Sequence, residues 1–125
     1  MIELQKEIRE LREQVIGIRR TLHKIPEPGL QENETTDYII KFLTALGLKV
    51  ERGVTGTGAI GYLEGKVGRK TIAYRADIDA LSVEEQTGVE YCSTKKGFMH
   101  ACGHDGHTAI LLGFAKYAVE NIDQI

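Results

Sequence analysis

Side chains of the kinds that bind metals gather in one short stretch of the chain, between positions 100 and 107. This stretch holds three of the four histidines and one of the two cysteines in the sequence. Its chemically active side chains are His100, Cys102, His104, Asp105 and His107. Imidazole nitrogens and thiolate sulfurs are ligands of zinc and other divalent transition metals. The stretch therefore predicts part of a metal site.

The spacing of Cys102 and His104 restricts the local structure. Residues two apart lie on opposite sides of a helix but on the same face of an extended segment. The two side chains can therefore share one ion only if the helix begins after them. Asp105 is a suitable N-cap, and apolar residues from position 109 to 119 recur at a helical period. Two ligands are half a site, so the remaining ligands must come from elsewhere.

A second group of polar side chains, Arg75, Asp77 and Asp79, follows the strand-like run 71–74. In α/β sheets, ligands gather at the carboxyl ends of strands. The alternation places the three side chains on one face of an extended chain. We weigh two interpretations: a functional site, or an Arg–Asp pair that closes a strand end. If both groups face one cleft, Asp77 can hydrogen-bond a metal-bound imidazole and fix its tautomer.

The elements that must position these groups follow from the apolar periodicity. Residues 2 to about 23 carry one apolar stripe of a long helix, which the segment 26–29 stops, and a second helix ends at Gly47. Three strand-like runs cover 48–52, 59–63 and 71–75, and a polar loop spans 83–98 before the last helix. The order helix, helix, three strands, loop, helix predicts part of a layered α/β domain.

The other three histidines are expected near the cleft but not on the metal. His23, at the end of the first helix, could be a ligand, but we favour a helix-end histidine that bonds to carbonyl groups or lines the cleft. His100 and His107 are expected to brace the turn through hydrogen bonds rather than to ligate directly.

Composition and length exclude several classes of function. At 125 residues the chain is at most one domain, with 42% hydrophobic and 27% charged residues, a formal net charge of −2 and a pI near 6.1. No basic surplus indicates nucleic-acid binding. No signal peptide and no apolar run of roughly 18 residues is evident, so we expect a cytoplasmic protein with no membrane contact. In a reducing cytoplasm, Cys92 and Cys102 are not expected to form a disulfide.

One motif points elsewhere. Gly56, Gly58 and Gly61 match the G-x-G-x-x-G pattern of dinucleotide-binding proteins, with Asp77 and Asp79 near the distance of a ribose-binding acid. That fingerprint requires the glycines to open a helix. The residues that follow are short, partly β-branched or aromatic, and end in another glycine, so we interpret the segment as a strand between two turns.

Two longer motifs resemble a known family. They are Arg-Ala-Asp-Ile-Asp-Ala-Leu at 75–81 and Met-His-Ala-Cys-Gly-His-Asp-Gly-His at 99–107, which runs into Thr108 and Ala109. Together with Arg19-Arg20-Thr-Leu-His23, Pro26-Glu27, Glu32 and Glu34-Thr35-Thr36, they resemble the metal-dependent amidohydrolase family of hippurate hydrolases, N-acyl-amino-acid hydrolases and indole-acetyl-amino-acid hydrolases. The resemblance covers essentially the whole chain.

The resemblance implies a layered α/β/α zinc-peptidase-like catalytic domain that holds two divalent ions: zinc, manganese, cobalt or nickel. A water activated by these ions would hydrolyse the amide bond of an N-acyl amino acid. By position, Cys102 looks like the ligand that bridges the ions, His104 like a ligand of one ion, and Asp77 like the orienting aspartate. Members of the family form homo-dimers or tetramers.

The family's pattern is longer than this sequence. Its members have several hundred residues, with a Glu–Glu pair that supplies the general base and a ligand, later histidine ligands and an inserted dimerisation domain. Residues 1–125 therefore correspond to the N-terminal part of the catalytic domain, and we expect them to lack activity alone, to bind metal weakly and to self-associate through an uncovered face. The alternative is a non-catalytic remnant that folds as a small α/β module.

Overall fold

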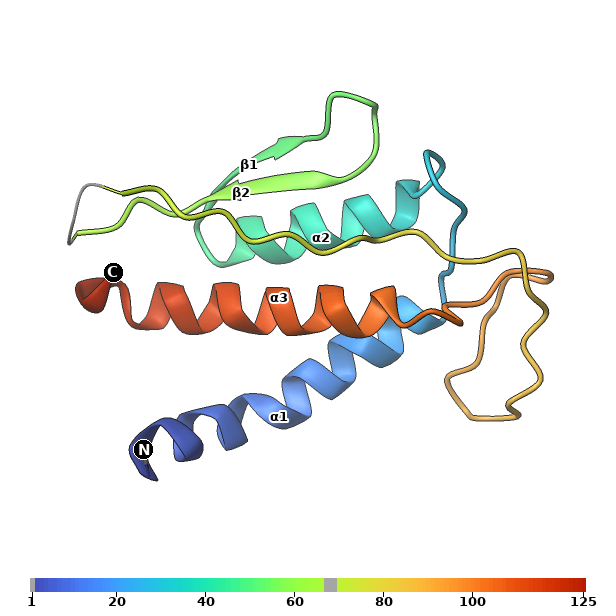
Figure 1. Ribbon diagram of the computed structural model, residues 1–125, viewed down its shortest axis with the longest axis horizontal. Helices are drawn as coiled ribbons and strands as arrows, with labels where there is room; N and C mark the ends of the chain where they lie inside the picture. The colour runs from blue at the N-terminus through green and yellow to red at the C-terminus, as the bar shows by residue number, and fades with distance from the viewer. Residues whose placement is uncertain (1, 67–69) are drawn as a thin grey trace.

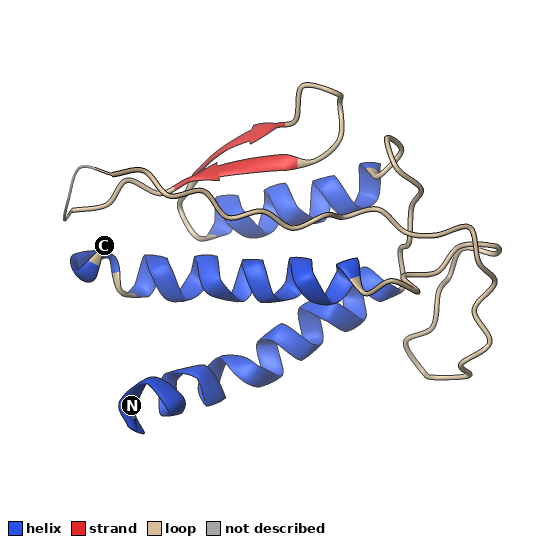
Figure 2. Ribbon diagram, in the orientation of Figure 1, coloured by secondary structure: helices blue, strands red, loops and turns tan. Residues whose placement is uncertain are grey.

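The computed structural model describes residues 2–66 and 70–125 (Figure 1). Three helices, one two-stranded hairpin and a terminal 3-10 turn follow one another in the described residues. Their bounds are α1 Ile2–His23, α2 Asn33–Ala45, β1 Lys49–Arg52, β2 Ala59–Tyr62, α3 His104–Glu120 and η1 Ile122–Gln124. The fold class is thus α/β, as the sequence predicts, and much of the connecting chain is irregular (Figure 2).

The first two helices confirm the sequence prediction closely. α1 ends at His23, three residues before Pro26, and α2 ends just before Gly47. Gly47 adopts a φ of 85° and its N–H donates to the carbonyl of Thr44 at 2.9 Å, which closes the last turn of α2. A positive φ strains residues that carry a Cβ, which is why glycine ends a helix in this way.

The glycine-rich motif belongs to a hairpin, as predicted. β1 and β2 pair antiparallel with Val50 opposite Gly61, and the Gly53 N–H donates to the Gly58 carbonyl at 2.8 Å in the turn. The glycines lead into strand β2 rather than into a helix, so this segment lacks the helix N-terminus that a dinucleotide site requires. The residues therefore serve the turn and strand of the hairpin.

The prediction of a third strand at 71–75 is wrong. Residues 70–80 carry no helix or strand assignment, and the only sheet in the described residues has the order β1–β2. The segment instead runs along α3: the Tyr74 and Phe114 rings lie 4.6 Å apart, and the Thr108 hydroxyl donates to the Asp77 carbonyl at 3.1 Å. β-type residues favour an extended chain, but a strand also needs a partner to complete its hydrogen bonds.

The start of the last helix also differs from the prediction. α3 begins at His104 with Gly103 as its N-cap, so Asp105 lies inside the first turn and makes no capping bond. Gly103 has a φ of 104°, a conformation that glycine adopts at little cost. The Asp105 carboxylate contacts Arg19 and His23 instead, which explains why it does not cap the helix.

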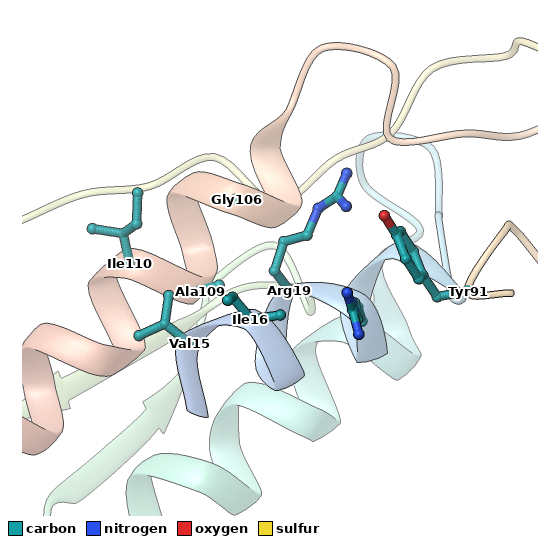
Figure 3. Close-up of a pocket in the computed structure, with 8 residues that line it drawn as sticks. Val15, Ile16, Arg19, Tyr91, Gly106, Ala109 and Ile110 are labelled. Carbon is teal, nitrogen blue, oxygen red and sulfur yellow. The ribbon is translucent and has the colours of Figure 1, made fainter. Parts of the chain in front are cut away.

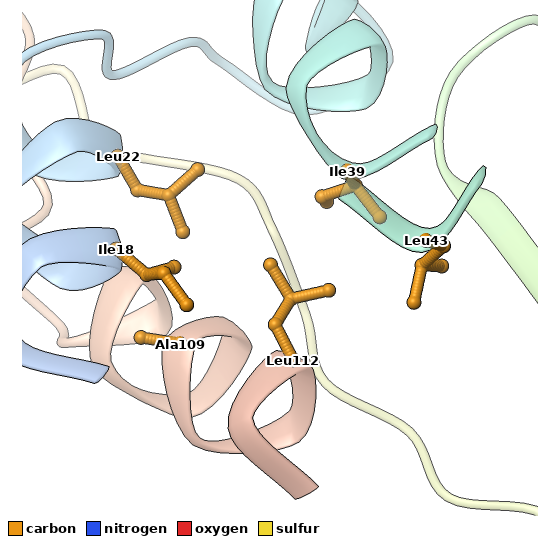
Figure 4. Close-up of a cluster of buried hydrophobic side chains, with 6 residues drawn as sticks. All are labelled: Ile18, Leu22, Ile39, Leu43, Ala109 and Leu112. Atoms are coloured by element: carbon orange, nitrogen blue, oxygen red, sulfur yellow. The ribbon is translucent and has the colours of Figure 1, made fainter. Parts of the chain in front are cut away.

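The core lies where the three helices meet. α3 contacts both α1 and α2, and the hairpin packs on α2. Figure 4 shows the buried side chains converging from the three helices; they are Ile18, Leu22, Ile39, Leu43, Ala109 and Leu112. In the part of the chain that the structure describes, no helix has the length and apolar character needed to cross a membrane.

Candidate metal site and its supporting network

Cys102 and His104 occupy the turn that leads into α3. Cys102 is an exposed free thiol just before the helix, and His104 is the first helical residue. The Gly103 carbonyl accepts hydrogen bonds from the Gly106 N–H at 2.9 Å and the His107 N–H at 3.2 Å, which fold the first turn. The two candidate ligands therefore extend from one turn, although only Cys102 precedes the helix.

Asp79 orients the His104 ring. Its Oδ1 lies 2.9 Å from His104 Nδ1, and its backbone carbonyl lies 3.1 Å from the same nitrogen. Both oxygens accept hydrogen bonds, so Nδ1 carries the proton and a neutral His104 keeps its lone pair on Nε2. Histidines that bind metals commonly donate their other ring nitrogen to a carboxylate in this way. The arrangement therefore prepares Nε2 of His104 as a ligand.

Asp77 does not make the contact suggested for it. Its Oδ1 instead accepts from Arg75 Nη2 at 2.7 Å, and both side chains are exposed. Asp79 shares the face of Asp77 in an extended chain, and the fold brings the later residue to His104. The Arg75–Asp77 pair matches the interpretation of an ion pair at the end of an extended segment.

The available donors fit one part of a metal site. A thiol at Cys102 and a free imidazole nitrogen at His104 suit a divalent transition ion. Within residues 2–66 and 70–125, however, no group of three or more His, Cys, Asp or Glu side chains is close enough to hold an ion. His107 is exposed, and its ring centroid lies 6.0 Å from that of His104.

His23 lies at the centre of a buried network behind this turn. Its Nδ1 lies 2.6 Å from Asp105 Oδ2, and its Nε2 lies 3.2 Å from Glu85 Oε1. Arg19 Nε donates to Asp105 Oδ2 at 2.8 Å. His23 thus bonds to carboxylates rather than to helix-end carbonyls, and it joins α1, the loop 83–98 and α3.

Glu85 fixes the loop end of this network. Its Oε2 accepts the Ser93 N–H at 2.6 Å, and the Thr87 hydroxyl donates to its Oε1. Burial alone would raise the pKa of Glu85, but hydrogen bonds from Thr87, Ser93 and His23, with the charge of His23, outweigh it and lower the pKa. Glu85 is therefore a carboxylate at neutral pH.

His100 is buried next to the network. Its ring centroid lies 6.3 Å from that of His23, and neither of its nitrogens has a hydrogen-bond partner among the described residues. Burial lowers the pKa of His100; the charges of Asp105 and Asp79 oppose this, and those of His23 and His104 add to it. His100 is therefore neutral at pH 7, and the hydrogen bonds expected of it are not formed.

A cavity of about 360 Å³ lies between α1 and α3 (Figure 3). Its lining is Val15, Ile16, Arg19, Arg20, Tyr91, Gly106, Ala109 and Ile110. The guanidinium carbons of Arg19 and Arg20 lie 5.4 Å and 4.8 Å from the centroid of the Tyr91 ring. Neither Cys102 nor His104 lines this cavity, so it is separate from the candidate metal ligands.

The sequence of the chain is similar to those of known hydrolases. Residues 73–125 match the family model described as Peptidase family M20/M25/M40. The chain is 45% identical over 124 residues to thermostable carboxypeptidase 1 of Saccharolobus solfataricus, covering 98% of this chain and 32% of that protein. It is 49% identical over 115 residues to N-acetyl-L-cysteine deacetylase of Bacillus subtilis, covering 92% of this chain and 28% of that protein.

A solved structure agrees with these sequences. The dinuclear metal binding peptidase of the M20 family from Bacillus subtilis superposes with a TM-score of 0.87 at 37% identity, covering 94% of this chain and 33% of that chain. The chain is similar to this M20 peptidase over nearly its whole length. It spans about a third of the length of the M20 relatives it matches.

Two residues of the buried network, Arg19 and Glu85, were not predicted as functional from the sequence. Arg19 appeared only within the family-like N-terminal motif, and Glu85 carried no signal at all. His23 and Asp105 are 82 positions apart, and His23 and Glu85 are 62 apart. Because local spacing says nothing about such distant pairs, the N-terminal motif was the one available indication that Arg19 and His23 matter.

Proposed function

We propose that the chain contributes Cys102 and His104 to the divalent-metal site of an M20 amidohydrolase that cleaves the amide bond of N-acyl amino acids. The observation that supports this most is the contact between Asp79 and His104 Nδ1 at 2.9 Å, which leaves Nε2 as the free ring nitrogen. The dinuclear metal binding of the structurally similar M20 peptidase agrees with it.

Each residue has a distinct task in this proposal. Cys102 would bind as a thiolate, because a metal ion displaces the thiol proton. His104 would bind one ion through Nε2 while Asp79 holds its tautomer. Zinc, manganese, cobalt or nickel ions would supply a water that ionises near neutral pH and a positive charge that polarises the amide carbonyl.

The substrate class follows from what the relatives' names have in common. A carboxypeptidase and an N-acetyl-L-cysteine deacetylase both cleave an amide whose amine side is an amino acid. We therefore assign an N-acyl amino acid to this site. A carboxylate that takes the proton of the attacking water and delivers it to the leaving amine would come from outside the 125 residues, together with the remaining ligands.

The alternative function is a non-catalytic α/β module. It gains support because, in the described residues, no three or more His, Cys, Asp or Glu side chains are grouped so that they could hold a metal ion. Under both proposals the chain by itself hydrolyses amides too slowly to detect, because it lacks a complete ligand set. The two proposals differ in whether Cys102 and His104 bind metal.

Zinc content of the purified chain separates them. We expect the parent to retain more zinc after equilibration than Cys102→Ser or His104→Ala, and His107→Ala to match the parent. Equal zinc content in all four proteins would overturn the metal assignment. Hydrolysis of N-acetyl-L-cysteine with added zinc or manganese is the second measurement: we expect none above background, and detectable hydrolysis by the chain would contradict the incomplete ligand set.

A further inference from the structure

We propose that His23 is a positioning residue that, as a doubly protonated imidazolium, locks the first turn of α3 and thereby the Cys102–His104 turn. The part of this proposal that concerns metal ligation depends on the proposed function. The part that concerns the charge of His23 and the rigidity of the turn does not.

The contacts of the ring favour a proton on each nitrogen. Asp105 Oδ2 lies 2.6 Å from Nδ1, and Glu85 Oε1 lies 3.2 Å from Nε2. An ionised carboxylate only accepts hydrogen bonds, so each ring nitrogen must donate. Arg19 Nη2 also lies 3.3 Å from Nδ1, but the shorter contact to Asp105 determines the role of that nitrogen.

Charge balance supports the same protonation state. The His23 and Asp105 side chains are only 3% and 1% exposed, and that of Glu85 is 4% exposed. With Arg19 on Asp105, a charged His23 gives two positive and two negative groups. A neutral His23 would leave a surplus negative charge in a buried site, which is costly. The nearest further titratable rings are His100, which is neutral, and Tyr91, whose ring packs edge-on at 5.9 Å.

Asp105 connects the network to the Cys102–His104 turn. Asp105 is the neighbour of His104 in the first turn of α3, and its Oδ2 is held from α1 by both His23 and Arg19. Glu85 anchors the loop 83–98 to the opposite side of the same ring. His23 therefore fixes the start of α3 relative to α1 and this loop, although it contacts neither proposed ligand.

The protonation state is measured on the unaltered chain. Nitrogen-15 NMR of the histidine side chains at pH 7.5 should show both nitrogens of His23 protonated, with His100 as a neutral ring. The assignment uses the loss of one set of signals in His23→Gln. A neutral tautomer at His23 in the unaltered chain would overturn the proposal.

Backbone hydrogen exchange tests the positioning. In His23→Gln we expect the Gly106 and His107 amides, which bond to the Gly103 carbonyl, to exchange about tenfold faster, because one charged hydrogen bond to Asp105 is lost. Amides in the middle of α3, such as that of Ala115, should keep their rates. Lys24→Ala, an exposed change at the same helix end, is the matched control. Unchanged rates at 106 and 107, or an equal rise throughout α3, would contradict the proposal.

Cobalt binding separates this proposal from the proposed function. His23→Gln should weaken Co²⁺ binding about tenfold relative to the parent and Lys24→Ala, as expected for a residue that orients ligands. Cys102→Ser should bind Co²⁺ still more weakly. If Cys102→Ser binds like the parent, the metal assignment fails while the ring and exchange results still stand. If only His23→Gln binds like the parent, the role of His23 in positioning the metal ligands is wrong.

Discussion

At the scale of single residues, Asp79 and His23 share the task of fixing one short turn. Asp79 sets the tautomer of His104, and His23 holds the carboxylate of the next residue along the chain. Neither side chain is a proposed ligand. The preorganisation of the candidate site therefore depends on groups behind the ligands, as is common for metal centres.

Asp79→Asn and Asp77→Asn distinguish the structure from the family resemblance. The family resemblance implies that Asp77 orients a metal-binding histidine. In the structure, Asp79 contacts His104 and Asp77 contacts Arg75. We expect Asp79→Asn to weaken zinc binding by roughly 10-fold to 100-fold, the range for groups that orient ligands, and Asp77→Asn to change it less than about threefold. Competition titration with a chromophoric chelator measures both. A larger loss of zinc binding in Asp77→Asn than in Asp79→Asn would show that Asp77, not Asp79, orients His104.

At the scale of elements, the N-terminus of α2 is capped from a distance. Its N-cap residue, Glu32, makes no side-chain capping bond. Glu27 does this instead: it accepts from the Thr35 N–H at 2.8 Å, the Thr35 hydroxyl at 2.8 Å and the Glu34 N–H at 3.1 Å. Lys95 Nζ lies 3.3 Å from the same carboxylate. Thus α2 is tied to the segment before it.

Acid should weaken this cap. Burial alone would raise the pKa of Glu27, but hydrogen bonds from Thr35 and Glu34 and the charge of Lys95 outweigh it and lower the pKa. A lowered folded-state pKa stabilises the fold above the unfolded-state pKa, about 4.3, and this stability is lost as pH falls through the folded-state value.

We therefore expect Glu27→Gln to reduce the free energy of unfolding by about 1–2 kcal/mol at pH 7. The difference between parent and variant should shrink as pH falls from about 4.3 through the lowered folded-state pKa of Glu27, because protonated Glu27 is neutral like Gln. Urea unfolding of the two proteins at pH 7 and pH 3 gives the comparison. A difference that is constant with pH would show that the charge of Glu27 does not contribute.

Elements defined by local signals could be predicted from the sequence, and those defined by distant partners could not. The apolar stripe of α1 and the stop at Gly47 gave two helices their correct ends. The run 71–75 has the residue types of a strand, but no partner strand among the described residues completes it. For the same reason, the contact between Asp79 and His104, which are 25 positions apart, could not be predicted from the sequence. The cluster of metal-binding residue types at 100–107 could be, because it is local.

At the scale of the whole molecule, one face combines an extended segment with exposed apolar side chains. Ile72 and Tyr74 on the segment 70–80 are 72% and 60% exposed, and Ile110 on α3 is 62% exposed. Figure 1 shows this segment running roughly parallel to α3, and Tyr74 contacts Phe114 of that helix. Exposed apolar groups beside an extended segment outside any sheet favour association with another chain.

We therefore predict that the isolated chain self-associates through this face. Light scattering of the parent at increasing concentration should show an average mass above that of the 13.9 kDa monomer. Ile72→Lys should shift the protein toward the monomer, and Val54→Lys, an exposed change in the hairpin turn, should not. A monomer at the highest soluble concentration would contradict the prediction.

If Cys102 and His104 hold one divalent ion together, the absorption spectrum of the cobalt-loaded chain should reveal both ligands. A thiolate ligand gives an intense sulfur-to-cobalt charge-transfer band, which we predict for the parent, with its loss in Cys102→Ser and its weakening in His104→Ala. A parent spectrum without this band, or one that Cys102→Ser leaves unchanged, would contradict the account.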